Sequence, residues 1–125
     1  MLSQSEITRL LDVANAACHH GHVFQARIIL AGILSAKPDH VPAMLGLVYS
    51  HIVTDDFVTA ESMLSEQILR HVPDDVDAKA MLGFVYSMTK RPEEARATLL
   101  PLTQIDDGTV NEKVAAMAKE ILATL

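Results

Sequence analysis

Residues 43–50 read Ala-Met-Leu-Gly-Leu-Val-Tyr-Ser, and residues 80–87 read Ala-Met-Leu-Gly-Phe-Val-Tyr-Ser. Seven of the eight positions are identical, and each residue returns 37 positions later. A fixed period of this length is typical of stacked helical hairpins, because one hairpin cannot bury its apolar face alone. The repeat therefore predicts an all-α protein made of stacked helical hairpins.

The composition favours helices and argues against nucleic acid as a ligand. Of the 125 residues, 50% are hydrophobic and only 4% are aromatic, so Ala, Leu, Val, Ile and six Met must build the core. The formal net charge is −6, and no basic cluster offers the positive surface that phosphate binding requires. The length is that of one domain with a core of its own.

Apolar residues recur at intervals of three and four along most of the chain, which is the spacing of amphipathic helices. This pattern predicts seven helices, at about 6–18, 23–36, 41–52, 57–71, 76–88, from 92 onward, and from about 109 to 125. The first six pair as three hairpins, and the last covers the exposed end of the stack. We expect the sixth helix to kink or end at Pro101, because proline cannot donate a backbone hydrogen bond.

Short polar residues and glycine mark the expected helix ends. Gly21 suits the left-handed turn that closes the first helix. Side chains that can accept a hydrogen bond from the first turn precede the helices. The candidate N-caps are Ser3 or Ser5, Asp55 or Asp56, Asp74 or Asp75, and Thr109 or Asn111.

Two glycines occupy the same place in the repeated stretch. Glycine in a helix interior costs about 1 kcal/mol relative to alanine, so its double occurrence asks for a packing reason. We expect Gly46 with Ala60, and Gly83 with Ala95, to mark places where two helices approach closely.

These residues resemble the tetratricopeptide repeat, a helical hairpin whose period is 34 residues. The third repeat carries the motif most clearly, through Gly83, Tyr86, Ala95 and Leu99, although Asp107 stands where proline is usual. The second repeat is about three residues longer. The first repeat matches more weakly, through Val13, Ala14, Ala26, Leu30 and Pro38.

The resemblance implies a single domain with the form of a right-handed solenoid. Its repeats would span about 7–38, 39–75 and 76–107, followed by a capping helix at about 109–125. In this family the first helix of each repeat lines a concave groove that receives a peptide or a helix. The groove positions implied here are Thr8, Leu11, Asn15, Cys18, His40, Ala43, Leu47, Ser50, Asp77, Ala80, Phe84 and Ser87.

The single difference between the two repeated stretches, Leu47 against Phe84, falls among these groove positions. A residue that contacts a partner is free to differ between repeats, whereas an architectural residue is expected to recur. Large apolar residues that are exposed together usually mark a binding site. The alternative is that Leu11, Leu47 and Phe84 pack against the next repeat or the terminal helix.

One ligand class of the family is excluded by the groove residues. Tetratricopeptide proteins that hold the acidic tails of heat-shock chaperones use Lys, Asn and Arg in the groove, and here only Asn15 fits. The apolar groove instead predicts an amphipathic helix or an extended hydrophobic segment as the ligand.

Little in the sequence indicates catalysis. The one group of potential metal ligands is His19, His20 and His22, which lies in a predicted turn without a second cluster to complete a site. We expect a solvated turn there, no cofactor and no enzyme; the alternative is a metal-dependent enzyme that uses these histidines. Cys18 is the single cysteine and is expected to be a small core residue rather than a reactive thiol.

The sequence also favours a soluble cytoplasmic protein. A lone cysteine fits a reducing compartment, and the first residues lack the order of a signal peptide. The longest apolar runs are far shorter than the roughly 20 residues that a membrane span needs.

In length, repeat number and groove character the chain resembles the small chaperones of bacterial type III secretion, a virulence system. The members closest in size hold the needle subunit, whereas a larger class serves the translocators. The resemblance implies that the chain clasps an amphipathic helix of the needle subunit, prevents premature polymerisation, and depends on a small helical co-chaperone. The alternative is a general scaffold module that assembles a complex or associates with itself.

Overall fold

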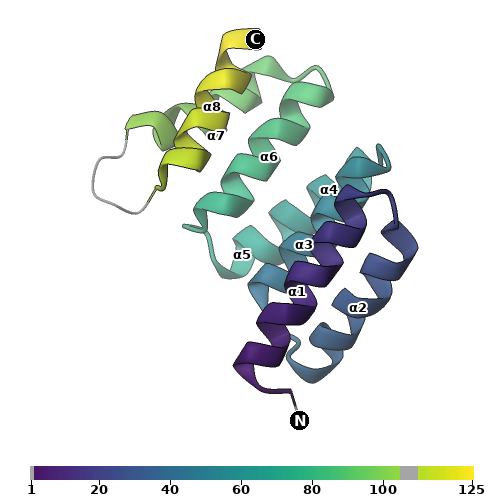
Figure 1. Ribbon diagram of the computed structural model, residues 1–125. Helices are drawn as coiled ribbons and strands as arrows, with labels where there is room; N and C mark the ends of the chain where they lie inside the picture. Colours follow the sequence, from purple (N-terminus) through teal and green to yellow (C-terminus); the bar gives the residue numbers. More distant parts are fainter. Residues whose placement is uncertain (1, 105–109) are drawn as a thin grey trace. The chain divides into compact units, whose positions relative to one another are not determined.

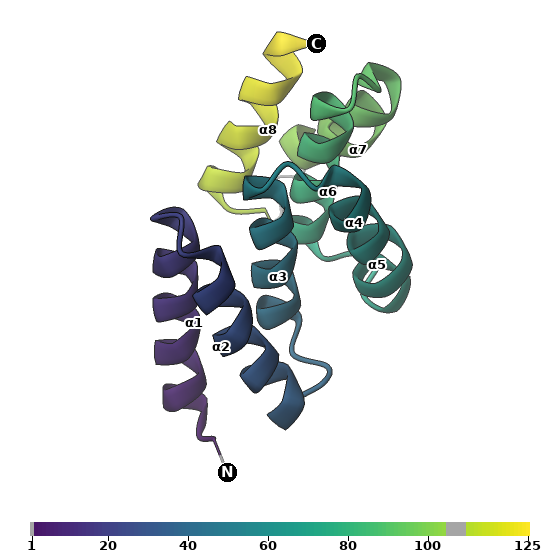
Figure 2. The same ribbon diagram turned by 90° about the vertical axis from the view of Figure 1, so that its right-hand side faces the viewer.

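The computed structural model of the protein describes residues 2–104 and 110–125. This part of the chain is helical, without a strand, as Figures 1 and 2 show. Its helices are α1 (Gln4–His19), α2 (Val23–Ala36), α3 (Val41–Val53), α4 (Phe57–Ser62), η1 (Met63–Ile68), α5 (Leu69–His71), α6 (Val76–Met88), α7 (Pro92–Gln104) and α8 (Glu112–Thr124). Since α4, η1 and α5 follow one another without a break, these are the seven predicted helices, and the all-α prediction is confirmed.

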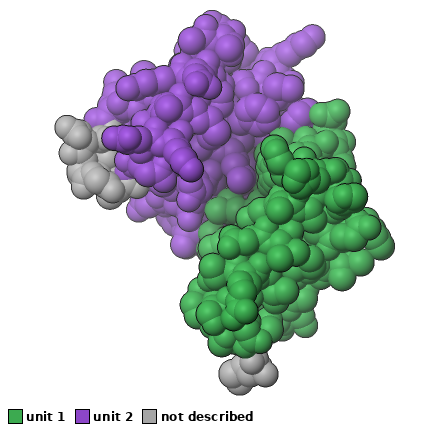
Figure 3. Space-filling model, viewed as in Figure 1, with its two compact units in different colours: residues 1–56 green, residues 57–125 purple. Residues whose placement is uncertain are grey.

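The chain divides into two compact units, residues 1–56 and residues 57–125, which Figure 3 distinguishes by colour. The first unit contains α1, α2 and α3, and the second contains α4 to α8. Their boundary falls inside the predicted second repeat, between α3 and α4.

In the first unit, α1 and α2 form a hairpin and α3 packs against both. The shared core consists of small and aliphatic side chains at helical spacing, namely Ile7, Ala14, Cys18, Ala26, Leu30, Ile33 and Ala43. Val13, which matches the repeat motif, is 55% exposed. Successive residues differ by about 100° around a helix, so the neighbour of the central Ala14 points away from the core.

In the second unit, α6, α7 and α8 share a core, and the helix of α4, η1 and α5 also packs against α6. The buried residues of this core are Ala80, Ala95, Leu99, Leu102, Val114 and Ala118. The inward residues are thus Ala95, Leu99 and Leu102 on α7 and Val114 and Ala118 on α8, whereas Leu100 is exposed.

The repeated glycines lie where a neighbouring side chain presses against the helix. A Cβ on Gly46 would come within 2.8 Å of Leu30 Cδ2 on α2. A Cβ on Gly83 would overlap Leu99 of α7, the helix that also carries Ala95. Gly83 therefore lies where α6 approaches Leu99 of α7, whereas the pairings of Gly83 with Ala95 and of Gly46 with Ala60 stay predictions.

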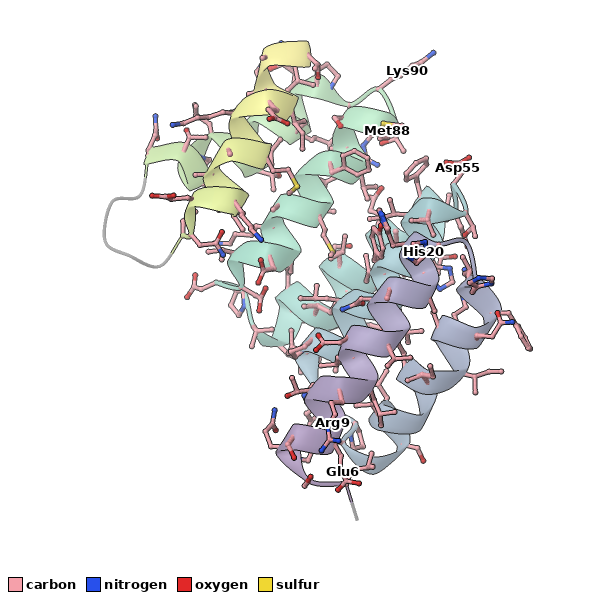
Figure 4. All side chains as sticks on the ribbon, in the orientation of Figure 1. Glu6, Arg9, His20, Asp55, Met88 and Lys90 are labelled. Atoms are coloured by element: carbon pink, nitrogen blue, oxygen red, sulfur yellow. The ribbon has the colours of Figure 1, made fainter. Side chains whose placement is uncertain are left out.

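Three helix ends share one turn geometry. After α1, α3 and α6, the second residue of the turn is left-handed, with φ of 88° at Gly21, 60° at Asp55 and 60° at Lys90. The next amide donates to a carbonyl five residues earlier, from His22 to Ala17, from Asp56 to His51, and from Arg91 to Tyr86. This is the Schellman closure, and Figure 4 labels Asp55 and Lys90 in two of these turns.

Most predicted N-caps occur as side-chain hydrogen bonds. Ser3 and Glu6 form a capping box, in which Ser3 Oγ accepts from the Glu6 amide at 3.2 Å and the Ser3 amide donates to Glu6 Oε1 at 3.0 Å. These bonds lower the pKa of Glu6. Asp75 and Asn111 accept from the third residue of the helix that each precedes. The other candidate for the last helix, Thr109, lies outside the described residues.

Two helices depart from ideal geometry. The sixth helix does not end at Pro101, because α7 runs on to Gln104; the alternative expectation, a kink at Pro101, stays a prediction. The carbonyl that loses its donor belongs to Ala97, which is exposed, so water can replace the missing bond. In η1 the helix widens to a π turn. Ala60, Leu64 and Ile68 are all buried, at intervals of four residues. In a regular α-helix, side chains at this interval would shift progressively around the helix axis and away from the core.

Candidate protein-binding site

Four of the twelve predicted groove residues are buried. Cys18 and Ala43 belong to the core of the first unit, and Ala80 belongs to the core of the second. Ser50 is also buried, and its hydroxyl donates to the Leu47 carbonyl at 2.6 Å. Burial raises the pKa of the Cys18 thiol, which fits its expected role as a core residue. These four side chains are occupied by internal packing.

In the first unit, the remaining candidates lie on or beside α1 and α3, which contact each other. Leu11 and Leu47 are half-buried against the core and present the rest of their side chains outward. Asn15 is exposed and lies beside Gly46. His40 Nδ1 accepts from the Ala43 amide at 3.3 Å and so caps α3.

Thr8 is exposed, and its hydroxyl donates to the Gln4 carbonyl at 3.0 Å. This bond lies within α1 and turns the hydroxyl back toward its own helix.

In the second unit, the candidates lie on α6. Phe84 and Ser87 are half-buried, and Asp77 is exposed in the first turn. The Ser87 hydroxyl donates to the Phe84 carbonyl at 2.6 Å, which repeats the bond between Ser50 and Leu47. Leu47 and Phe84 thus occupy equivalent places in their helices, both half-buried and of different size. Whether the candidates of the two units line one groove stays a prediction.

A polar clamp that the sequence analysis missed connects α2 to the end of α3. Arg27 Nε donates to Ser50 Oγ at 3.0 Å, and Nη2 lies 3.3 Å from the Ser50 carbonyl and 3.3 Å from Thr54 Oγ1. Nη2 also lies 3.2 Å from His51 Nδ1. The positive charge is thereby placed at the negative end of the α3 dipole.

His51 lies between two charges in this clamp. Its Nδ1 is 3.4 Å from Asp56 Oδ2 as well as near Arg27. Desolvation and the charge of Arg27 lower the pKa of His51, and Asp56 opposes them only in part. The ring is therefore neutral near pH 7, and its Nδ1 lone pair accepts from Arg27.

A second clamp occurs at the equivalent place in the second unit. Arg91, in the turn after α6, pairs with both carboxylate oxygens of Glu61 on α4 and with Glu94 of α7. Its guanidinium also lies 4.5 Å from the centre of the Tyr86 ring. The hydrogen bonds to the two carboxylates raise the pKa of Arg91, and Arg91 lowers the pKa of Glu94. Burial and then Glu61 raise the pKa of Tyr86.

The signal for both clamps was present in the sequence. Arg27 and Glu61 each follow the buried alanine of their helix, and each is its fifth residue. The equivalent residue of the third repeat, Arg96 of α7, instead pairs with Glu93 on its own helix at 2.9 Å. The clamp thus occurs at this position in the first two repeats, with an arginine in the first and a glutamate in the second, but not in the third.

The histidine cluster shows no metal-binding arrangement. Among the described residues, no group of three or more His, Cys, Asp or Glu side chains is placed to hold a metal ion. The rings of His19 and His20 meet edge to face, with centroids 5.5 Å apart. Within the same residues, no helix combines the length and apolar character required to cross a membrane.

Hairpins joined by a recurring clamp, with half-exposed apolar side chains on the first helix of consecutive repeats, define a helical-repeat protein of the kind that binds other proteins. The family model described as tetratricopeptide repeat matches residues 55–121, which is more than half of the chain. The chain belongs to the tetratricopeptide repeat family. Searches of curated proteins and of solved structures found no match.

Proposed function

We propose that the chain is a non-enzymatic cytoplasmic chaperone that binds an amphipathic helix of a partner protein in an apolar groove. The observation that carries this proposal is the partial exposure of Leu11, Leu47 and Phe84, each of which is half-buried. Side chains of this kind keep a fixed position and still have apolar surface to offer. Each can contribute about 1–3 kcal/mol when a partner covers it.

The partner that we propose is the needle subunit of a type III secretion system, held together with a small helical co-chaperone. Support comes from the resemblance in size, repeat number and groove character. A needle subunit polymerises through its own amphipathic helix, so capture and polymerisation compete for the same apolar stripe. The more general alternative is a scaffold that joins proteins without protecting either from assembly.

Coexpression tests the proposal. The chain is produced alone, with a needle subunit, and with both the subunit and its co-chaperone, and the products are compared by size-exclusion chromatography and light scattering. We expect a monodisperse complex in which the subunit no longer forms polymers. The matched control is Val58→Asp, which adds the same charge at an 83% exposed site outside the predicted groove.

A chaperone role predicts that Leu47→Asp releases the subunit to polymerise whereas Val58→Asp does not. A chain that is monodisperse alone and leaves polymerisation unchanged would contradict the chaperone proposal and favour the scaffold.

A further inference from the structure

Helix α2 is apolar on two opposite sides. Its inner side carries the buried Ala26, Leu30 and Ile33. Its outer face consists of the exposed residues Phe24, Ile28, Ala31, Gly32 and Ser35, which recur at helical spacing. Phe24 is 73% exposed and Ile28 is 57% exposed. Large apolar residues that are exposed together on one face are normally covered, and this face lacks a partner among the described residues.

Charge is absent from this face for a structural reason. Arg27 is the one charged residue of α2, and its guanidinium is held by Ser50, His51 and Thr54 at the end of α3. The equivalent faces of the other two repeats carry carboxylates, through Glu66 in η1 and Glu93 in α7. The apolar outer face is therefore a property of the first repeat and not of the repeat in general.

Gly32 adds a second observation. It lies inside α2, and a Cβ added there would have nothing within 4 Å. The packing reason that applies to Gly46 and Gly83 is thus missing at Gly32, although glycine is unfavourable in a helix interior. A glycine on an exposed apolar face permits another helix to approach closely.

We propose that the outer face of α2 pairs with the same face of a second copy of the chain. Size decreases along the face, from Phe24 and Ile28 at one end to Ala31, Gly32 and Ser35 at the other. In an antiparallel pair about a two-fold axis, Phe24 faces Ser35 of the other copy and Ile28 faces Ala31. Large side chains then meet small ones, and Gly32 leaves room beside Ile28.

The charge distribution favours a second copy over a charged partner. Residues 4–36 contain Glu6, Asp12, Arg9 and Arg27, so this hairpin is neutral while the whole chain has a net charge of −6. Pairing through α2 therefore brings two neutral hairpins together. A helix of 14 residues is about 21 Å long, so its face is smaller than the roughly 800 Å² per partner of a stable complex. The dimer should be weak and reversible.

Sedimentation equilibrium of the full chain from micromolar to millimolar concentration tests this pairing. We expect a reversible monomer–dimer equilibrium that Ile28→Glu and Phe24→Glu each shift toward the monomer by at least about tenfold in dissociation constant. The control Val58→Glu, at an exposed valine of α4, should leave the equilibrium unchanged. Circular dichroism verifies that each variant remains helical.

The register of the antiparallel α2 pair, in which Ile28 faces Ala31 of the other copy, is tested by a mixture of two variants. Ile28→Glu and Ala31→Lys should each dimerise poorly alone and associate when mixed, because the two new charges then face each other. Three results would overturn the proposal: a wild-type chain that stays monomeric over the whole range, which would leave the face to a helix of another protein; a dimer that survives Ile28→Glu and Phe24→Glu; or a mixture that remains monomeric.

Discussion

At the scale of single residues, the three Schellman turns show how one backbone conformation is retained while the residue changes. Gly21 adopts the left-handed conformation without steric cost, whereas Asp55 and Lys90 adopt it with a side chain present. Aspartate tolerates this conformation better than lysine, since its short polar side chain can bond locally. The turn geometry is therefore determined by the two helices that it joins, and not by which residue occupies the left-handed position.

Replacing the left-handed lysine should stabilise the chain. We expect Lys90→Gly to raise the free energy of unfolding by about 0.5–1 kcal/mol, because relief of the strain exceeds the added entropy of the unfolded chain. Asp55→Gly should give a smaller gain. Urea unfolding measures both, with Lys90→Ala as the control that keeps the strain. Equal stability of Lys90→Gly and Lys90→Ala would contradict this explanation.

His51 gives a pH dependence whose sign follows from its surroundings. Its pKa is lowered in the folded chain, so the unfolded chain binds more protons as the pH falls. The neutral ring contributes its full stability at pH values above the pKa of histidine in the unfolded chain, about 6.5. This contribution is lost as the pH falls through the lower pKa of the folded chain.

We expect His51→Asn, which keeps an acceptor near Arg27, to reduce the loss of stability between about pH 7 and pH 5. Thermal unfolding at both pH values measures this loss in the wild type and in the variant. His71→Asn, at an exposed position of α5, is the matched control. If the wild type and His51→Asn lose the same stability on acidification, the claim that the neutral ring of His51 stabilises the fold is wrong.

At the scale of helices, sequence reasoning located ends better than interiors. Val23–Ala36 and Val76–Met88 were predicted at their observed bounds, because proline, glycine and N-cap residues act locally. Whether a helix ends at Pro101 could not be predicted, because the outcome depends on whether the freed carbonyl is exposed, which only the packed structure decides. The widening at η1 was missed for a similar reason, since it follows from which side chains are buried.

The candidate site was less predictable than the fold. Repeat register places Leu47 and Phe84 at equivalent positions, but register does not distinguish the buried Ala43 and Ala80 from residues with exposed surface. The clamps of Arg27 and Arg91 were missed because each joins residues more than 20 positions apart, and both partners also suit a solvated helix face.

The clamp in the second unit should stabilise the contact of α4 with the turn after α6. We expect Arg91→Ala to lower the urea midpoint more than Arg96→Ala does, because Arg91 holds two carboxylates and covers Tyr86 whereas Arg96 holds only Glu93. Both variants remove one positive charge, so a general charge effect cancels in the comparison. Equal midpoints for the two variants would show that the clamp adds no stability.

At the scale of the whole molecule, one small repeat protein has two kinds of candidate binding surface. We propose that half-buried apolar residues on the first helices of the repeats bind a partner helix, and that the uncharged outer face of α2 binds a second copy. The two surfaces lie on different helices, so they can be tested separately. Loss of dimerisation through Ile28→Glu should leave partner binding unchanged.

Calorimetric titration of a partner's amphipathic helix with Phe84→Asp tests the groove most directly. We expect the affinity to fall at least about tenfold, in line with the loss of one apolar anchor, while the helical circular dichroism signal is kept. Val58→Asp should bind as the wild type does. Unchanged affinity of Phe84→Asp would contradict the groove, and loss of its helical signal would instead assign Phe84 to the core.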